Sequence, residues 1–190
     1  MLKYFEGADP STIAQYQKII AIKDDVKRIA SYLEISEIQV RQVKEHIFIN
    51  FHDIDFPDLN TQTTISFRGN FTPDREIADL WIKANNRNLQ YREMTKFRRL
   101  IAHEYVEQAL MKDGLPYQSR EGWRKHPQFE VFAYWPSPEY HGAHDLAPNP
   151  SRPQPFSHWE KIIGKSPEGL ILADDLSNLD ELLEAIRGRI

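Results

Sequence analysis

The chain has no cysteine among its 190 residues. Disulfide frameworks and thiolate metal sites are therefore excluded, and any metal ion must be held by His, Asp or Glu. Long hydrophobic runs are missing as well: no stretch approaches the roughly 18 apolar residues of a membrane-spanning helix, and the N-terminal segment lacks a basic region followed by an apolar run. We therefore expect a soluble, cytoplasmic protein with no membrane partner.

An excess of basic charge is also missing. The formal net charge is -4, which gives no overall attraction for nucleic-acid phosphates. The charge is uneven, because acidic residues dominate positions 1–60 and the C-terminal tail, whereas positions 75–125 have a modest basic excess that includes Arg98 and Arg99. Such a stretch can hold a nucleic-acid backbone, although a run of charge is more often a solvated surface.

Hydrophobic residues make up 41% of the chain, which is enough to bury a sizeable core in one main domain. Apolar residues at helical spacing, together with helix-capping patterns at Asp9 and at Ser36 with Gln39, predict several helices. The predicted helices cover residues 9–33, 36–48, 73–85, 89–114 and 177–190. The segments that predict short strands, the first of them a strand or an extended loop, are residues 61–71, 127–135 and 168–175.

These elements predict a mainly α, α+β fold: a compact helical domain with a few short strands and a C-terminal strand-helix appendage. Residues 1–150 form the main domain and carry the histidines and glutamates discussed next. Residues 151–190 form a Pro-rich connector and a C-terminal helix that packs on the main domain or beside it.

The segment RLIAHEYVEQALMKDG places His103, Glu104 and Glu107 on one predicted helix. A histidine and a carboxylate four residues apart share a helix face and can bind one cation from adjacent turns, which leaves Glu104 free to act on water. The two histidines of an HExxH helix bind zinc in the same way. Glutamate is also common on solvated helix faces, so the motif alone is equally consistent with a structural helix.

A later segment, YHGAHDLAP, carries a third candidate ligand. His144 is the natural partner of His103 and Glu107, because helix-based metal sites often take another ligand from a later part of the chain. Alone, this segment is more often a polar loop. His126, His141 and His158 are interpreted as ordinary loop histidines.

The segment KEHIFINFH contributes Lys44, His46 and His52. The lysine can stabilise developing phosphate charge, and the histidines can act as general acid and base near neutral pH. A histidine on a mixed helix is usually structural, so this segment gains weight only in combination with the others. Glycine-rich phosphate loops, dinucleotide-binding fingerprints and a serine nucleophile elbow are not found in the sequence.

The order of these motifs resembles a family of C-terminal effector modules of bacterial polymorphic toxins, as found on Rhs-type proteins. The matching segments are VKEHIF, FTPDREIADLWIKA, LIAHEYVEQALMKDG and YHGAHDLAP, within residues 26–147. The residues that the resemblance marks are Lys44, His46, His52, Trp81, His103, Glu104, Glu107, Tyr140 and His144. The sequence departs from the family at residues 85–89 and in a long insertion at 115–139. The resemblance implies delivery into a target-cell cytoplasm and a cognate immunity protein as partner.

Together the motifs predict a toxin-like hydrolase, a nuclease that cleaves phosphodiester bonds in a nucleic-acid substrate. With a divalent metal, zinc or manganese, His103, Glu107 and His144 are the expected ligands and Glu104 activates water. Without a metal, His46 or His144 pairs with Glu104 as acid and base, and Lys44 or Arg99 stabilises the phosphorane charge. The further catalytic and substrate-binding candidates are His46, Lys44, His52, Arg98, Arg99 and Tyr140.

Two alternatives remain open at this point. A zinc-dependent metallopeptidase would share the metal ligands and would need a strand edge to bind an extended peptide. A non-catalytic interaction domain, of adaptor or immunity type, would use the histidines only for local hydrogen bonds and bind its partner through the Trp-, Tyr- and Pro-rich segment.

Overall fold

A computed structural model gives the fold, and it describes residues 3–4, 9–126, 128 and 130–190. The described α-helices are α1 (Pro10–Ala21), α2 (Asp25–Leu33), α3 (Glu37–Lys44), α4 (Arg75–Asn85), α5 (Tyr91–Lys112), α6 (Ala143–Leu146), α7 (Trp159–Ile162) and α8 (Leu179–Arg187). A π-helical turn, η1 (Glu45–Ile49), extends α3, and a 3-10 turn, η2 (Arg120–Gly122), precedes the third strand. The prediction of a mainly α, α+β fold is confirmed.

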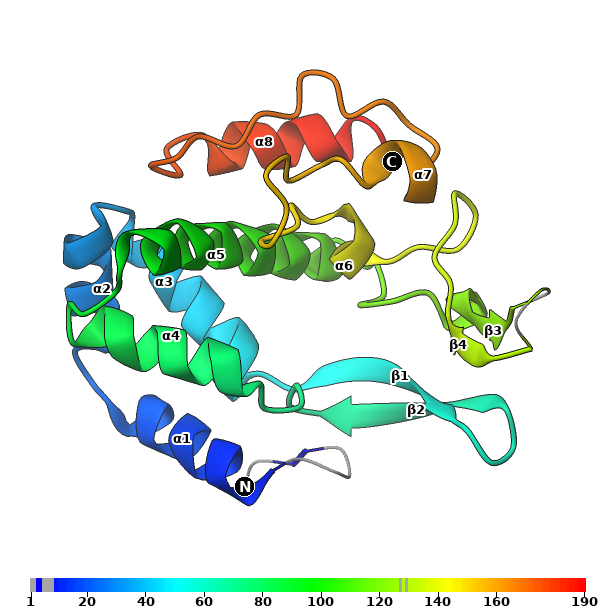
Figure 1. Cartoon of the computed structure of the whole chain (residues 1–190), viewed down its shortest axis with the longest axis horizontal. Helices are drawn as coiled ribbons and strands as arrows, with labels where there is room; N and C mark the ends of the chain where they lie inside the picture. The colour runs from blue at the N-terminus through cyan, green and yellow to red at the C-terminus, as the bar shows by residue number, and fades with distance from the viewer. Residues whose placement is uncertain (1–2, 5–8, 127, 129) are drawn as a thin grey trace.

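Helix α5 runs through the centre of the molecule, with α3 and α4 on one side and α8 on the other (Figure 1). Helix α6 packs near the C-terminal end of α5, and α1 packs on α4. The buried apolar residues form one core to which α1 to α6, α8 and the segment before α8 all contribute. Within the described part of the chain, no helix has the length and apolarity that crossing a membrane requires.

The predicted single helix over residues 9–33 is wrong, because the chain breaks between α1 and α2. Ile22 has an extended backbone (φ -74°, ψ 123°) and ends α1. The break frees the carbonyl of Ile22, which accepts a hydrogen bond from Lys44 Nζ at 2.8 Å. It also lets Asp25, the first residue of α2, turn into the core, where it is fully buried, whereas Lys23 and Asp24 stay exposed.

The second predicted helix is confirmed as α3, but its capping box is wrong. Ser36 is the residue before the helix and its side chain makes no capping bond. The amide of Gln39 instead donates to the Leu176 carbonyl at 3.5 Å, so it joins α3 to the segment before α8. The helix then widens into η1, and such π-turns are frequent at functional sites.

Two small antiparallel sheets complete the fold. Strand β1 (His52–Asp58) pairs with β2 (Thr63–Gly69), which confirms the strand predicted within residues 61–71, whereas β1 was not predicted. Strand β3 (Trp123–Lys125) pairs with β4 (Phe132–Tyr134). Residues 127 and 129 of the strand predicted at 127–135 lie outside the described residues.

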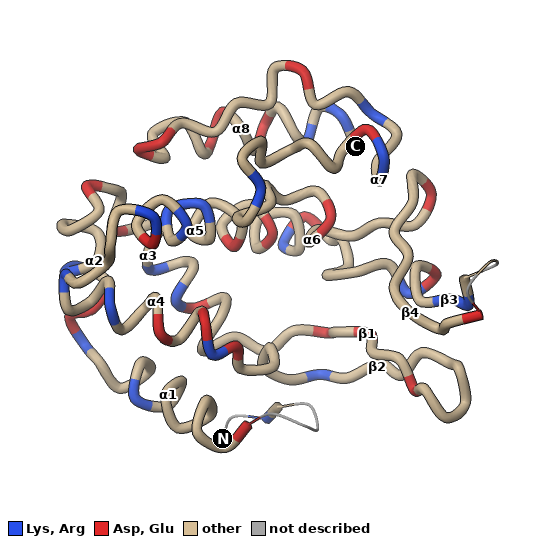
Figure 2. Tube along the Cα trace, in the orientation of Figure 1, with Lys and Arg blue, Asp and Glu red and all other residues tan. Residues whose placement is uncertain are grey.

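The strand predicted at residues 168–175 is wrong: this segment forms turns and extended loop. The side chain of Asn178, and not a neighbouring strand, forms hydrogen bonds with the backbone of this segment. It accepts from the Ala173 amide at 2.9 Å and donates to the Ile171 carbonyl at 2.8 Å. Helix α8, predicted at the C-terminus, is confirmed and packs on α5. Figure 2 shows Lys and Arg spread over most elements and interspersed with Asp and Glu.

Candidate metal centre

The middle of α5 buries three ionisable side chains. His103 is 6% exposed, Glu104 8% and Glu107 2%. The alternative in which this motif is the solvated face of a structural helix is therefore wrong. Burying a charged group without a partner costs several kcal/mol, so these side chains require compensating contacts. Those contacts come from η1 and from α6.

Glu107 is the centre of the cluster. Its Oε1 lies 3.0 Å from His46 Nε2, on η1. Its Oε2 lies 2.8 Å from His144 Nδ1, on α6, and 3.2 Å from His103 Nε2, one turn before it on α5. Burial alone would raise the pKa of Glu107, but its contacts with the three histidines hold that pKa well below the ordinary value. Glu107 is therefore ionised at neutral pH.

One face of this cluster has the shape of a metal site. The atoms His103 Nε2, His144 Nδ1 and Glu107 Oε2 are separated by 3.2, 3.2 and 2.8 Å. A tetrahedral zinc ion with bonds of about 2.0–2.1 Å sets its ligand atoms about 3.3 Å apart. These three atoms therefore already have nearly the spacing of ligands on one ion.

The tautomer of His103 supports the same interpretation. Its Nδ1 lies 3.1 Å from the Pro148 carbonyl, which can only accept, so Nδ1 carries a proton. In the neutral ring Nε2 then has a lone pair, and that lone pair faces Glu107 Oε2. Only a cation between the two atoms, a second proton or a metal ion, makes this arrangement favourable. A metal-binding histidine commonly donates its other N–H to a carbonyl in this way.

His46 has the opposite arrangement. Its Nδ1 is buried and has no hydrogen-bond partner among the described residues. A ring that binds a metal through Nε2 would leave an N–H without an acceptor at this position, which is unfavourable. The ring is therefore the Nε2–H tautomer and donates to Glu107 Oε1. His46, Glu104 and Glu107 form a second group with the spacing to hold an ion, but His46 is better explained as a donor that orients Glu107.

Glu104 lies beside the cluster without a short contact to it. Its Oε2 is 3.8 Å from His46 Nε2. Burial raises the pKa of Glu104 to about 8, and the charge of Glu107 adds to this effect. A carboxyl with this pKa is suited to exchange a proton near neutral pH. For His144, burial would lower the pKa, but its contact with Glu107 raises it overall.

The wide turn η1 and its neighbours position His46. His52 Nε2 donates to the His46 carbonyl at 2.9 Å, and the two rings make an edge contact at 4.7 Å. Phe71 stacks on His52, with 4.3 Å between ring centroids. Burial lowers the pKa of His52, which favours its neutral form. The structure thus gives His52 a supporting position behind His46, whereas the sequence predicted substrate binding.

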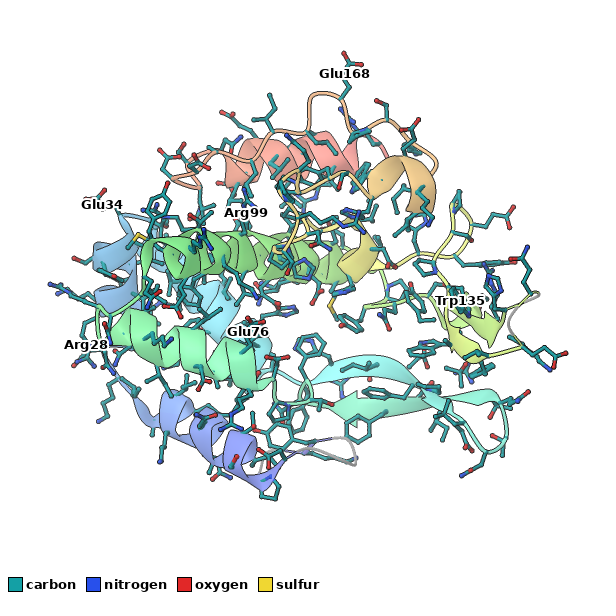
Figure 3. All side chains as sticks on the ribbon, in the orientation of Figure 1. Arg28, Glu34, Glu76, Arg99, Trp135 and Glu168 are labelled. Carbon is teal, nitrogen blue, oxygen red and sulfur yellow. The ribbon has the colours of Figure 1, made fainter. Side chains whose placement is uncertain are left out.

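The structure places four other predicted site residues away from the cluster. Lys44 forms a buried ion pair with Asp25 at 2.8 Å. Arg98 donates to the Leu33 carbonyl and Arg99 to the Arg152 carbonyl, and Figure 3 shows Arg99 on the side of α5 toward the C-terminal segment. The remaining one is Tyr140, whose ring lies under the guanidinium of Arg124.

Two cavities that share part of their lining reach the His103, Glu107 and His144 triangle, and sequence reasoning missed most of their lining. The larger, about 470 Å³, includes Lys96 and Arg152, and the smaller, about 320 Å³, is lined by Phe and Tyr rings, aliphatic side chains and carboxylates. Asp74, Ile77, Glu104 and His144 line both. Tyr117, from the insertion after α5, lies 5.1 Å from His144 between ring centroids. Asp74 lies in the matching segment FTPDREIADLWIKA but is not among the residues that the resemblance marks, and Tyr117 belongs to no motif of the sequence.

No family model, curated protein or solved structure matches this chain. Its buried groups of histidine and glutamate can nevertheless hold a metal ion. The function must therefore be inferred from the geometry of the cluster and of the cavities around it.

Proposed function

We propose that this protein is a metal-dependent hydrolase that cleaves phosphodiester bonds. One divalent ion, zinc or manganese, is held by His103 Nε2, His144 Nδ1 and Glu107 Oε2. The observation that carries the proposal is the triangle of these atoms, with sides of 2.8 to 3.2 Å, in which the lone pair of His103 faces a carboxylate. Two nitrogen ligands and one carboxylate, with a position left for substrate, are typical of catalytic zinc sites.

Glu104 is the general base of the proposed reaction. A divalent ion supplies charge that polarises the phosphate and activates water. Glu104 accepts a proton from the attacking water, whose oxygen forms a bond to phosphorus as the bond to the leaving oxygen breaks. The leaving oxygen then takes a proton from solvent. His46 holds Glu107 in place through its Nε2–H and takes no part in the proton transfer.

Phosphodiester chemistry is favoured by the larger cavity. Lys96 and Arg152 line it beside His103 and His144, so they can contact the flanking phosphates of a polynucleotide. Lys96 is paired with Glu76, and Figure 3 shows Glu76 at the end of α4 nearest the β1–β2 sheet. The resemblance to toxin effector modules supports a nuclease as well, and it would add an immunity protein as partner.

One observation favours a metallopeptidase as the second candidate. Within the described residues β1 pairs only with β2, so one edge of β1 is free for an extended peptide. Ile54 and Phe56 of β1 also line the smaller cavity beside Glu107. A peptidase would use the same ion and the same base.

The first experiment is metal analysis of the untagged protein and of two variants, His103→Ala and His144→Ala. We expect about one equivalent of zinc or manganese in the wild type and at least a tenfold loss in both variants. His141→Ala is the matched control, because the Nδ1 of His141 contacts the Ser137 carbonyl at 3.2 Å and the ring lies outside the triangle. The control should keep its metal.

Cleavage assays with RNA, DNA and peptide substrates then assign the reaction. Phosphodiester cleavage by the metal-loaded wild type, lost in His103→Ala and in Glu104→Gln, is the expected result. Cleavage of peptide alone would favour the peptidase. A folded His103→Ala variant with full activity would overturn the proposed site, and equal partner binding without turnover by all variants would indicate an interaction domain.

A further inference from the structure

The smaller cavity is lined in part by aromatic rings. Its described lining includes the rings of Phe56, Phe71, Tyr16 and Tyr117, and it reaches Glu104, Glu107 and His144. Its volume of about 320 Å³ lies at the low end of small-ligand sites, which are about 300–1,000 Å³. A planar aromatic group smaller than a whole nucleotide therefore suits it.

The charges of the two cavities differ. The described residues of the smaller cavity include carboxylates, Asp74 among them, but no Lys or Arg, so this cavity disfavours a phosphate. The larger cavity is lined by carboxylates as well, Asp74 and Glu76 among them, but of the two cavities it is the one that also has cations, Lys96 and Arg152. A substrate polymer with an anionic backbone and flat uncharged side groups would place its backbone in the larger cavity and one flat group in the smaller cavity. A polynucleotide has this division.

The aromatic rings are held in place by their neighbours. Phe71 is fixed on one face by His52, with an interplanar angle of 21°, and its centroid lies 5.1 Å from that of Tyr117. Tyr117 in turn lies 5.1 Å from His144. The rings that could contact a base are therefore connected directly to the proposed metal ligand, which places a bound base next to the reacting phosphate.

Burial of the site limits which nucleic acids can reach it. Among the proposed ligands only His144 is substantially exposed, with 39% of its side chain accessible. In a duplex each base is covered by its pairing partner and by the stack, and it must leave both before it can enter a protein cavity. An unpaired base avoids that cost, and base–aromatic stacking is largely independent of sequence.

We infer that the smaller cavity takes one unpaired nucleobase beside the cleaved bond, so that the substrate is single-stranded nucleic acid. The inference rests on the proposed function and adds the substrate class to it. The backbone then follows the larger cavity past Lys96 and Arg152. Phe71 and Tyr117 are the residues that bind the base.

The test compares one oligonucleotide as a single strand and annealed to its complement, with the metal-loaded protein. We expect the single strand to be cleaved at least tenfold faster. Phe71→Leu keeps an apolar side chain but removes the ring, and it should lower kcat/KM for the single strand about 5- to 150-fold, the range expected for one stacked base. Phe132→Leu, the same change in β4 and outside both cavities, should leave the rate unchanged.

A second measurement covers the case in which Phe71→Leu folds poorly. Fluorescence anisotropy of a labelled single-stranded oligonucleotide measures its binding to the Glu104→Gln protein, with and without Tyr117→Leu. Tyr117→Leu should lower the affinity by the same 5- to 150-fold. Equal cleavage of duplex and single strand would overturn the inference, and so would a normal rate in folded Phe71→Leu together with normal binding in Tyr117→Leu. In either case nuclease activity that depends on His103 would leave the proposed function standing. Cleavage of peptide and of no nucleic acid would overturn the proposed function itself.

Discussion

At the scale of the residue, His46 and His103 differ in the contact made by Nδ1, and this difference separates a residue that orients Glu107 from a proposed metal ligand. Both rings face Glu107, His46 at Oε1 and His103 at Oε2. His103 has a carbonyl on its other nitrogen, as a metal ligand does, whereas the other nitrogen of His46 is buried without a described partner. In the proposed site His46 therefore orients a ligand, and His103 is itself a ligand.

His46→Gln and His46→Leu should separate these roles. Both variants remove the ring that packs on Phe71, but Gln retains an N–H donor that can reach Glu107. We expect His46→Leu to weaken metal binding about 10- to 100-fold, as loss of a group that orients a ligand typically does, and His46→Gln to recover most of that affinity. Competition with a chromophoric chelator measures the affinity, and thermal unfolding of the metal-free proteins reports on folding. Two metal equivalents in the wild type, one of them lost in both variants, would instead make His46 a ligand.

At the scale of the element, a buried polar contact holds α2, α3 and α4 together. Asp25 Oδ1 lies 2.8 Å from Lys44 Nζ, and Asp25 Oδ2 accepts from Trp81 Nε1 at 2.9 Å. The side chains of Lys44 and Asp25 are only 8% and 0% exposed. The toxin-module resemblance marked both Lys44 and Trp81, and the structure gives them a shared position in the helix packing.

Lys44→Met should therefore affect folding and not the chemistry of the cluster. Removal of one partner of a buried ion pair leaves the other charge uncompensated and typically costs about 3–5 kcal/mol. We expect a loss of this size in the free energy of unfolding, measured with urea, and unchanged metal stoichiometry in the folded fraction.

The double variant Lys44→Met with Asp25→Asn is the control for this prediction. Asn cannot be charged but can still accept from Trp81, so the double variant should be more stable than Lys44→Met alone. If Lys44→Met unfolds like the wild type but loses cleavage of nucleic acid, Lys44 acts in the reaction and the structural role is wrong.

Much of the element order could be predicted from the sequence, and the failures have local causes. Helix α5 was predictable because Gly114, with φ 102°, ends it as expected of a glycine. The break after Ala21 was not predicted, because the group that binds the freed Ile22 carbonyl is Lys44, which lies 22 residues further along the chain. Of the proposed metal site, His103, Glu107 and His144 were predictable from helical spacing and a short motif, whereas Pro148 and Tyr117 contribute through contacts that no spacing encodes.

At the scale of the whole molecule, the cluster depends on elements that are far apart in sequence. Helix α6 carries His144 and is supported from behind by the C-terminal segment. His158 Nε2 donates to the Asp145 carbonyl at 2.9 Å, and Trp159 Nε1 donates to the Leu146 carbonyl at 3.2 Å. Residues 151–190 were predicted to pack on or beside the main domain, and these contacts make them part of the support of the site.

Deletion of residues 151–190 should therefore abolish both folding and metal binding. It removes buried apolar side chains at Trp159, Leu179, Leu182, Leu183 and Ile186. Each buried side chain of this kind contributes about 1.5–3 kcal/mol, so their sum is comparable with the whole stability of a domain, about 5–15 kcal/mol.

Calorimetry should show no cooperative transition for residues 1–150, and metal analysis should find less than a tenth of an equivalent. Deletion of the partly exposed Ile190 alone is the control and should change neither result. A cooperative transition in the shortened protein, with one equivalent of metal retained, would show that residues 1–150 fold and build the site without the C-terminal segment. It would also mean that His158 and Trp159 are not needed to hold His144 against Glu107.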